Sequence, residues 1–411
     1  MTASAASTPA PVLPPIVVLG STAPAPTPEG VRAALGASVT RPALGTSGIW
    51  IGDATTGATL LDAKAATPLL PASALKLLTA ATALRELGPA HRIATRVVLD
   101  GTRMTIIGGG DATLKSTGAG ASLAVLARRA AAQAPKAPVD LTYDISLFRG
   151  RTLAAGWSRS FPAAGVVAPV QALMADQGRA RPGGNSRVDD PARAAAAAFA
   201  RALRAAGVTV RAVTAGTAPA GATEIARVVS APVQLLVNHM LTDSDNDLAE
   251  GLAHLSGIAA GGEGSFAGGA QAMTATAKAL NLPTQGIALF DGSGLSSRDR
   301  IAAQALGGIL LHSAQGTFGG IAPALAVAGF TGTLADRFTS RAQHSAAGYV
   351  RAKTGTLSTV VNLAGIVPDV DGRVLVFAIM ANDIPSIGRA RTAVDQIATR
   401  LRACGCRTTT P

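Results

Sequence analysis

The stretch Pro71-Ala-Ser-Ala-Leu-Lys-Leu-Leu-Thr79 carries a serine and a lysine three residues apart at the start of an apolar segment. On a helix, this spacing puts the Ser73 hydroxyl and the Lys76 amine on one face, within reach of each other. A serine becomes an effective nucleophile only when a neighbouring base takes its proton. Burial makes a lysine shed its proton more readily, so a buried Lys76 fits that task. The pair alone is weak evidence, because the same spacing also arises by chance.

Two further short strings follow along the chain, Ser244-Asp245-Asn246 and Lys353-Thr354-Gly355-Thr356. In isolation, the first is more typical of a helix cap and the second of a strand end with a turn. In this order, however, the three strings form the set found in serine acyl-transfer sites of penicillin-binding proteins and class A β-lactamases. Coincidence therefore becomes the minor interpretation.

The remaining pattern predicts an α/β chain of the α+β kind. A helix is expected from Ser73 to about Leu87, and apolar strands over 360–367 and 373–380 are expected to form a central hairpin covered by helices. Residues 121–221 alternate between helices and strands and separate the first string from the second. Because both strings must meet in one site, this block predicts an inserted domain.

The expected division of the chain has four parts. They are a Pro/Ala-rich linker at 1–30, a discontinuous catalytic domain at 31–94 plus 232–403, an inserted domain at 95–231 and a tail at 404–411. The glycine-rich string Asp291-Gly-Ser-Gly lacks the full G-x-S-x-G motif and is expected to be a structural turn close to the site.

The chain has 411 residues, enough for two or three domains with a sizeable core. It carries 36 Lys and Arg against 24 Asp and Glu, which gives a formal net charge of +12. This charge favours an anionic partner such as a membrane surface or an acidic cell-wall polymer. Nucleic acid is not expected, because the arginines are scattered and aromatic residues make up only 3%.

Neither a cofactor nor a metal ion is expected. The histidines are dispersed, no H-E-x-x-H string occurs, and each histidine is expected to serve packing or the surface. Cys404 and Cys406 stand outside the three strings, and a pair separated by one residue could close only a strained disulfide. The sequence leaves open whether they form one.

With the three strings and several softer ones, the chain resembles the D-alanyl-D-alanine carboxypeptidase/endopeptidase family of low-molecular-mass class C penicillin-binding proteins. The softer strings are Gly109-Gly-Asp-Ala-Thr-Leu114, Ala168-Pro-Val-Gln-Ala-Leu173, Asp291-Gly-Ser-Gly-Leu-Ser296 and Gly332-Thr-Leu334. The resemblance covers roughly residues 46–402 and implies a penicillin-binding, serine β-lactamase-like catalytic domain. Its antiparallel sheet is flanked by helices and interrupted by a large insertion.

The family's residue roles carry over to the matching positions. By this resemblance, Ser73 attacks the carbonyl between two terminal D-alanines and Lys76 accepts its proton. Ser244, with Lys353 nearby, relays a proton to the leaving D-alanine, and Asn246 holds the substrate amide. The resemblance therefore implies a serine DD-carboxypeptidase that acts on peptidoglycan stem peptides. It leaves open whether the protein is also a DD-endopeptidase, and it implies that β-lactam antibiotics are covalent inhibitors.

The third string carries the substrate-binding residues Thr354, Gly355 and Thr356 in this resemblance. The Thr354 and Thr356 hydroxyls receive the terminal carboxylate, and the backbone N–H groups of Ser73 and Thr356 form the oxyanion hole. The strand itself pairs with the extended stem peptide of peptidoglycan. Between Phe148 and Asp176 the chain has no acidic residue to receive a diaminopimelate amine. The third residue of the preferred stem peptide therefore stays open.

A peptidoglycan-acting enzyme is expected outside the cytoplasm. The supplied chain has no run of about eighteen apolar residues that could span a bilayer, and its first residues lack the features of a signal peptide. We therefore expect a secreted protein, or one anchored by a segment that this sequence does not contain.

Two alternative functions remain. A serine β-lactamase shares the acylation step but needs fast deacylation, and class A enzymes use a glutamate in an E-x-x-L-N string for it. Only Glu250 and Glu263 lie between residues 247 and 352, and neither begins that string. The second alternative is a non-catalytic cell-wall-binding protein of the same fold, which would have no need of the complete set of catalytic residues.

Overall fold

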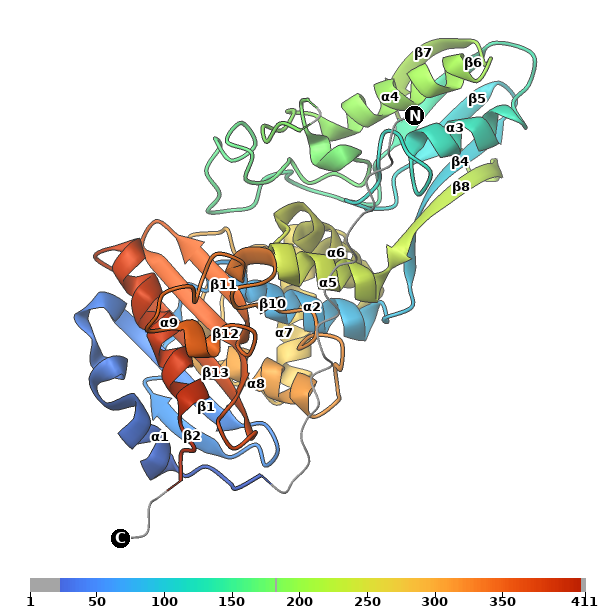
Figure 1. Ribbon diagram of the computed structural model, residues 1–411. Coiled ribbons are helices and arrows are strands. Elements are labelled where there is room, and N and C mark those ends of the chain that lie inside the picture. The colour runs from blue at the N-terminus through green and yellow to red at the C-terminus, as the bar shows by residue number, and fades with distance from the viewer. Residues whose placement is uncertain (1–22, 182, 408–411) are drawn as a thin grey trace, which may run out of the picture.

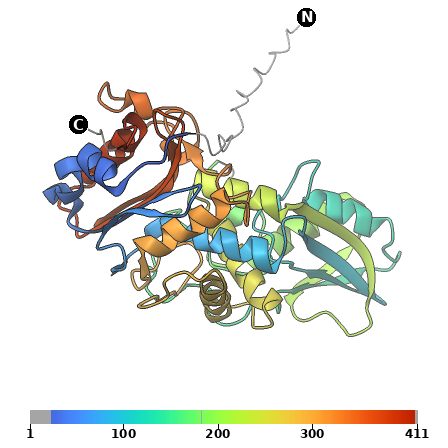
Figure 2. The same cartoon turned by 90° about the horizontal axis from the view of Figure 1, so that it is seen from below.

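The computed structural model describes residues 23–181 and 183–407. Two sheets lie at opposite ends of the molecule, with a layer of helices between them (Figures 1 and 2). The larger sheet has six strands in the order β10-β11-β12-β13-β1-β2, and every neighbouring pair is antiparallel. Its strands are β1 (Thr46–Asp53), β2 (Thr59–Ala63), β10 (Ala326–Val327), β11 (Arg351–Leu357), β12 (Val360–Pro368) and β13 (Val374–Asn382).

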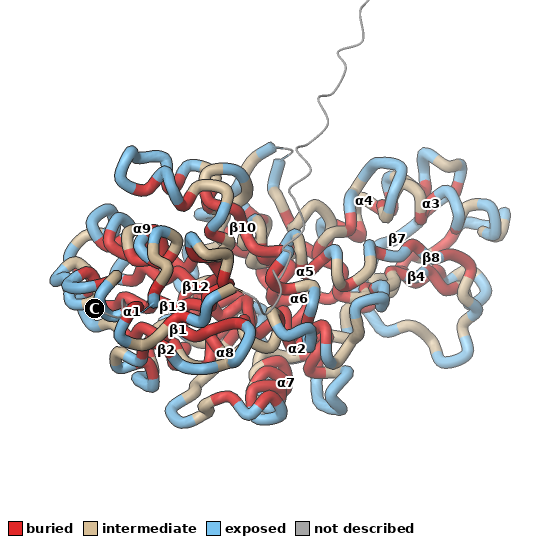
Figure 3. The backbone as a smooth tube through the Cα atoms, turned by 60° about the horizontal axis from the view of Figure 1, so that its bottom comes forward, coloured by how far each residue is buried: buried red, intermediate tan, exposed pale blue. Residues whose placement is uncertain are grey.

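The two faces of this sheet belong to two separate hydrophobic cores. Phe377 and Ile379 of β13 pack toward α1 (Pro28–Leu35) and α9 (Ile387–Ala403), whereas Val376 and Met380 pack toward the helical layer. Successive side chains of a strand point to opposite faces, so both sets must be apolar when both faces are covered. Strands β12 and β13 are accordingly buried along nearly their whole length (Figure 3). The predicted central hairpin and the antiparallel sheet flanked by helices are confirmed.

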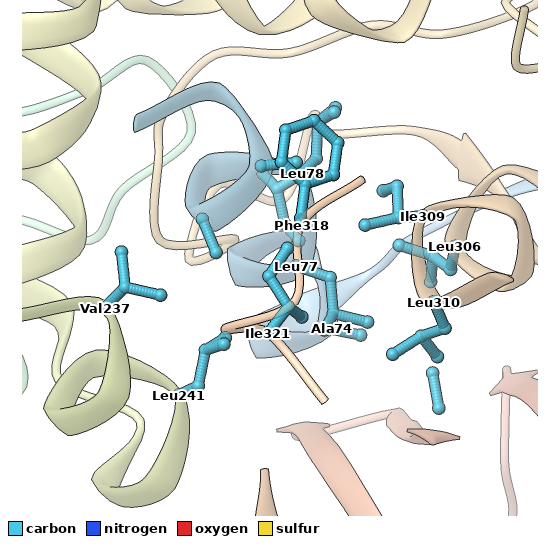
Figure 4. Close-up of a cluster of buried hydrophobic side chains, with 14 of the residues drawn as sticks. Ala74, Leu77, Leu78, Val237, Leu241, Leu306, Ile309, Leu310, Phe318 and Ile321 are labelled. Atoms are coloured by element: carbon cyan, nitrogen blue, oxygen red, sulfur yellow. The ribbon is translucent and has the colours of Figure 1, made fainter. Parts of the chain in front are cut away.

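The middle layer is built around α2 (Lys76–Glu86). Leu77 and Leu78 of this helix lie in one apolar cluster with residues of α5 and α8 (Figure 4). Such burial of apolar surface is the main force that holds α2, and Lys76 at its start, in place. The other helices of the layer are α5 (Val233–Asp243), α6 (Asn246–Ala259), α7 (Phe266–Ala279) and α8 (Ala303–Ala314), and the two-stranded sheet β3 (Pro68–Leu69) and β9 (Ile301–Ala302) adjoins them.

The second sheet has the order β7-β6-β5-β4-β8 and its own hydrophobic core. Its strands are β4 (Arg92–Asp100), β5 (Arg103–Ile107), β6 (Val139–Asp144), β7 (Val210–Ala215) and β8 (Thr223–Pro232), and α3 (Leu123–Ala131) and α4 (Pro191–Ala205) pack on it. β4 follows α2 and β8 leads into α5, so the chain leaves and re-enters the helical layer through adjacent strands. The inserted domain at 95–231 stays our proposal for this part.

The two ends of the described chain meet on one side of the larger sheet. Helix α1 begins at Pro28 because the Thr27 hydroxyl caps it, and residues 28–30 therefore belong to a helix instead of a linker. The Thr27 N–H donates to the Cys406 carbonyl at 2.7 Å, and Cys404 and Cys406 form a disulfide. Most of the predicted linker lies outside the described residues.

Candidate active site

Ser73 lies on a 3-10 turn (Ala72–Leu75) that precedes α2, so the predicted helix begins as a tighter turn. Strand β11 runs close to this turn. A Cβ atom at Gly355 would stand 2.7 Å from the Pro71 carbonyl oxygen and 3.2 Å from the Ala74 nitrogen. Only glycine therefore lets the strand approach the nucleophile this closely.

Lys76 is completely buried, and its amine makes three hydrogen bonds. Nζ lies 3.0 Å from Ser73 Oγ, 2.7 Å from Asn246 Oδ1 and 2.8 Å from the Ser293 carbonyl oxygen. Burial lowers the pKa of Lys76 to about 8, and the nearby charges of Asp291 and Glu250 oppose this shift. The amine is therefore both within reach of the serine proton and able to exist in its neutral form near neutral pH.

The second amine, on Lys353, is also completely buried. Its Nζ donates to Ser244 Oγ at 2.8 Å and to the Thr354 carbonyl oxygen at 3.0 Å. Burial, assisted by repulsion from Lys76, lowers the pKa of Lys353 well below its ordinary value. The site therefore holds two amine–hydroxyl pairs, Lys76 with Ser73 and Lys353 with Ser244.

The Ser244-Asp245-Asn246 string lies between α5 and α6. Ser244 has a left-handed backbone (φ 60°) at the end of α5, and the Asp245 carboxylate caps α6 by accepting from the Leu248 N–H at 2.9 Å. This turn aims Ser244 at Lys353 and Asn246 at Lys76. Asp245 therefore caps the helix, and the catalytic roles of Ser244 and Asn246 stay predictions.

The third string exposes its residues unequally. Thr354 is 7% exposed and its Oγ1 donates to Thr333 Oγ1 at 2.9 Å, whereas Thr356 is exposed. Thr333 lies in the Gly332-Thr-Leu334 string of the family resemblance, for which the sequence analysis predicted no role in the site.

Asn362 is a second residue that sequence reasoning missed. From β12, its Nδ2 donates to the Pro71 carbonyl at 2.6 Å, and its Oδ1 accepts from the Ala381 N–H at 3.0 Å. It thereby ties the backbone just before Ser73 to the sheet. A single amide in the otherwise apolar run from Val360 to Val367 was the signal available for finding it.

Part of the predicted insertion returns to the site. The Val166 carbonyl accepts from Asn246 Nδ2 at 2.8 Å, and the Ala168 N–H donates to Asp247 Oδ1 at 2.7 Å. Arg187 forms an ion pair of 2.9 Å with Asp247, and both side chains are buried. The N-terminal end of α6, which carries Asn246, is therefore held by residues from the other part of the chain.

Two further expectations can be compared with the structure. The Asp291-Gly-Ser-Gly string is a turn against Lys76, as predicted. His254 is buried between Phe148 and Phe266, and burial lowers its pKa to about 4, which fits the predicted packing role. Within residues 23–181 and 183–407, no cluster of His, Cys, Asp and Glu is arranged to hold a metal ion. In the same ranges, no helix is long and apolar enough to cross a membrane.

Comparison with known proteins places this geometry in context. The profile of the D-Ala-D-Ala carboxypeptidase 3 (S13) family matches residues 31–186 and 181–403. A carboxypeptidase of Mycobacterium tuberculosis is 36% identical over 338 residues, which cover 77% of this chain and 71% of that protein. Carboxypeptidase DacB of Mycolicibacterium smegmatis is 36% identical over 313 residues, covering 73% and 67%.

A solved structure shows the same fold. The crystal structure of penicillin binding protein 4 from Haemophilus influenzae matches with a TM-score of 0.75 at 20% identity, over 91% of this chain and 98% of that chain. The same protein in complex with a β-lactam matches with a TM-score of 0.70 at 20% identity, over 87% and 95%. At this identity the match concerns the arrangement of the chain.

Proposed function

Because the chain belongs to the D-Ala-D-Ala carboxypeptidase 3 (S13) family, we propose that its two amine–hydroxyl pairs hydrolyse the terminal D-Ala–D-Ala bond of peptidoglycan stem peptides. The protein is a serine-type carboxypeptidase by family, and its substrate class places its action outside the cytoplasm. The observation that carries the proposal is the 3.0 Å contact between Ser73 Oγ and the buried Lys76 amine.

Acylation begins when neutral Lys76 takes the proton of the Ser73 hydroxyl. Oγ then attacks the carbonyl carbon of the penultimate D-alanine, and the carbonyl oxygen becomes an oxyanion. We assign its stabilisation to the backbone N–H groups of Ser73 and Thr356. Asn246, held between Lys76 and the Val166 carbonyl, is placed to orient the substrate amide.

Collapse of the intermediate breaks the C–N bond and releases D-alanine, whose nitrogen needs a proton. The Ser244 hydroxyl, in contact with Lys353 at 2.8 Å, is placed to deliver it. Thr354, Gly355 and the exposed Thr356 lie on β11, where the terminal carboxylate and the extended peptide would bind. Water then attacks the acyl ester, and Ser73 regains its proton.

The burial of Glu250 argues against a fast β-lactamase. Its carboxylate oxygens accept the N–H groups of Gly292 and Ser293 at 3.0 and 2.7 Å, and the side chain is 0% exposed. A carboxylate committed to the backbone in this way is not free to activate a water molecule for deacylation. We therefore expect a β-lactam adduct on Ser73 to persist.

The test is intact-protein mass spectrometry after incubation with benzylpenicillin, followed over hours, with Ser73→Ala as the control. We expect a lasting mass increase equal to one benzylpenicillin on the unchanged protein alone. In parallel, release of D-alanine from a pentapeptide ending in D-Ala-D-Ala should depend on Ser73. A protein that forms no adduct and releases no D-alanine would contradict the catalytic proposal, and rapid multiple turnover of the drug would favour a lactamase.

A further inference from the structure

One peptide bond lies between the Lys76 amine and a buried carboxylate. The Ser293 carbonyl accepts from Lys76 Nζ at 2.8 Å, and the N–H of the same peptide bond, on Gly294, donates to Asp291 Oδ1 at 2.7 Å. Hydrogen bonds in such a chain polarise one another, because a negative charge at the N–H end makes the carbonyl a stronger acceptor. Asp291 therefore acts on the amine without touching it.

The buried side chain of Asp291 is surrounded by hydrogen-bond donors. It is 2% exposed, yet its two oxygens accept three N–H donors. Besides Gly294, these are the Ser296 N–H and Trp157 Nε1, each 2.7 Å from Oδ2. Donation by several N–H groups stabilises the ionised form of a carboxyl group. Trp157 comes from the predicted insertion, so that part of the chain also contributes to this arrangement.

The neighbouring carboxyl group of Asp299 is also buried, but it has fewer hydrogen-bond donors than Asp291. It is 0% exposed, and Oδ1 accepts from the Phe290 N–H at 2.7 Å. Its Oδ2 has no hydrogen-bond partner among the described donors, and its carboxyl group lies against that of Asp291. Burial and then the Asp291 charge raise the pKa of Asp299 to about 10. Asp299 is therefore protonated at neutral pH and can donate its proton in a hydrogen bond to the Asp291 side chain.

Several other titratable groups lie near Lys76 and also influence its pKa. Glu250 holds the Gly292 and Ser293 N–H groups from α6, and its pKa is raised to about 8 by burial and by Asp291. The remaining groups are Asp245, which caps α6, Asp247 on α6 and Lys353 on β11. Among the acidic groups around Lys76, Asp291 is the one that accepts the Gly294 N–H. This N–H belongs to the same peptide bond as the Ser293 carbonyl, which accepts from the Lys76 amine.

We propose that Asp291 is a positioning residue for acylation, which fixes the Lys76 amine beside Ser73 through the Ser293–Gly294 peptide bond and sets how tightly that amine holds its proton. The inference rests on the proposed function, in which neutral Lys76 is the base. Trp157 and Asp299 act one step further out, by holding the Asp291 carboxylate in place.

Two substitutions that keep the size of the side chain distinguish the effect of the Asp291 charge from a general disturbance of the packing. Asp291→Asn removes the negative charge, so Lys76 loses its proton more easily and the acidic limb of the acylation profile moves to lower pH, by roughly one unit. The maximal second-order rate constant with benzylpenicillin should also fall roughly tenfold, because the amine is less well held. Asp299→Asn places an N–H donor where the Asp299 O–H stood and should leave the midpoint of the limb unchanged.

A second variant serves if Asp291→Asn does not fold, as judged by circular dichroism. Trp157→Phe keeps the Asp291 charge and the ring packing against Phe161 and Phe266, but it deletes one hydrogen bond. We expect a severalfold lower rate with an unmoved midpoint, and an unchanged rate would overturn the proposal.

The outcomes with Asp291→Asn are equally distinct. A profile that coincides with that of the unchanged protein overturns the inference, as does an equal shift in Asp299→Asn, which would indicate a general disturbance of the cluster. If the unchanged protein itself is not acylated, the proposed function fails before this inference is reached.

Discussion

At the scale of single residues, the site depends on two lysines whose surroundings lower their pKa values. Lys76 and Lys353 are both 0% exposed, and burial is the first cause of the lowered pKa of each. A lysine near the surface would stay protonated and could not accept the serine proton. The catalytic use of these residues thus follows from where the fold places them as much as from their identity.

The lowered pKa of Lys76 predicts the pH dependence of acylation. Below about 8 the amine binds a proton and cannot act as the base, so the acylation rate should fall about tenfold per pH unit on the acidic side. The measurement is the second-order rate constant with benzylpenicillin between about pH 5 and about pH 9. A rate independent of pH below the midpoint would contradict the assignment of Lys76 as the base.

The matched control for this profile is His239→Gln. His239 contacts Asp243 and Asp245 beside Ser244, and its pKa is raised above the ordinary value, chiefly by Asp245. It is a titratable group next to Ser244 that could produce a similar acidic limb. The midpoint of the acidic limb of the acylation profile should be the same in His239→Gln as in the unchanged protein.

At the scale of elements, glycines explain why two helices were not predicted. Helices α7 and α8 carry the pairs Gly268-Gly269 and Gly307-Gly308, which lower intrinsic helix propensity. The structure shows what these glycines permit. A Cβ at Gly307 would stand 2.2 Å from the Trp50 ring, so α8 can approach this ring only because position 307 has no side chain. Close packing here outweighs local preference.

The buried ion pair between the two parts of the chain predicts a large loss of stability. Arg187→Ala would leave Asp247 buried without its cation, at a cost of roughly 3–5 kcal/mol in the free energy of unfolding. Urea unfolding measures this change. Acylation should fall as well, because Asp247 adjoins Asn246 at the start of α6.

The control uses a pair on the surface of the second sheet. Arg211→Ala breaks the exposed contact with Asp140 and should leave the unfolding curve in place. Equal effects of the two substitutions would show that burial of the ion pair is not what matters.

The amide of Asn362 predicts a coupled loss of stability and activity. Asn362→Asp keeps the acceptor for the Ala381 N–H but sets an oxygen against the Pro71 carbonyl, so we expect at least about 2 kcal/mol of destabilisation. Acylation should slow in parallel, since Pro71 precedes the nucleophile turn. Unfolding curves and rate constants are compared with Asn281→Asp, an exposed position that should show neither effect.

At the scale of the whole molecule, the net charge of +12 predicts attraction to an anionic cell-wall polymer. Ser73→Ala should bind purified cell wall as well as the unchanged protein does, because this attraction does not involve the nucleophile. Raising the salt from about 0.05 M to about 1 M should release both proteins, since screening shortens the range of surface charges. Binding to the cell wall that does not weaken with salt, or equal binding to an uncharged polysaccharide, would contradict an electrostatic cause.

Sequence patterns were sufficient where the determining interactions are local. The continuous apolar strands on either side of residue 370 indicate the central hairpin before any coordinates, and the three-residue spacing of Ser73 and Lys76 predicts the contact between their side chains. The order of the three strings also identifies the family, and the family comparison confirms it. These features depend on neighbours within a few residues, which a sequence displays directly.

The sequence by itself thus determined the chemistry available to this protein, namely a serine with a lysine, a second hydroxyl and a second lysine, in order along the chain. Only the tertiary structure decided how they are supported. Lys76 meets Asn246 and Ser293 across 170 and 217 residues of chain, and Asp291 acts on it through a peptide bond. Such contacts arise from strand register and helix packing between distant segments. They leave no periodic pattern in the sequence, and burial, which lowers the pKa of both lysines, exists only once those segments have come together.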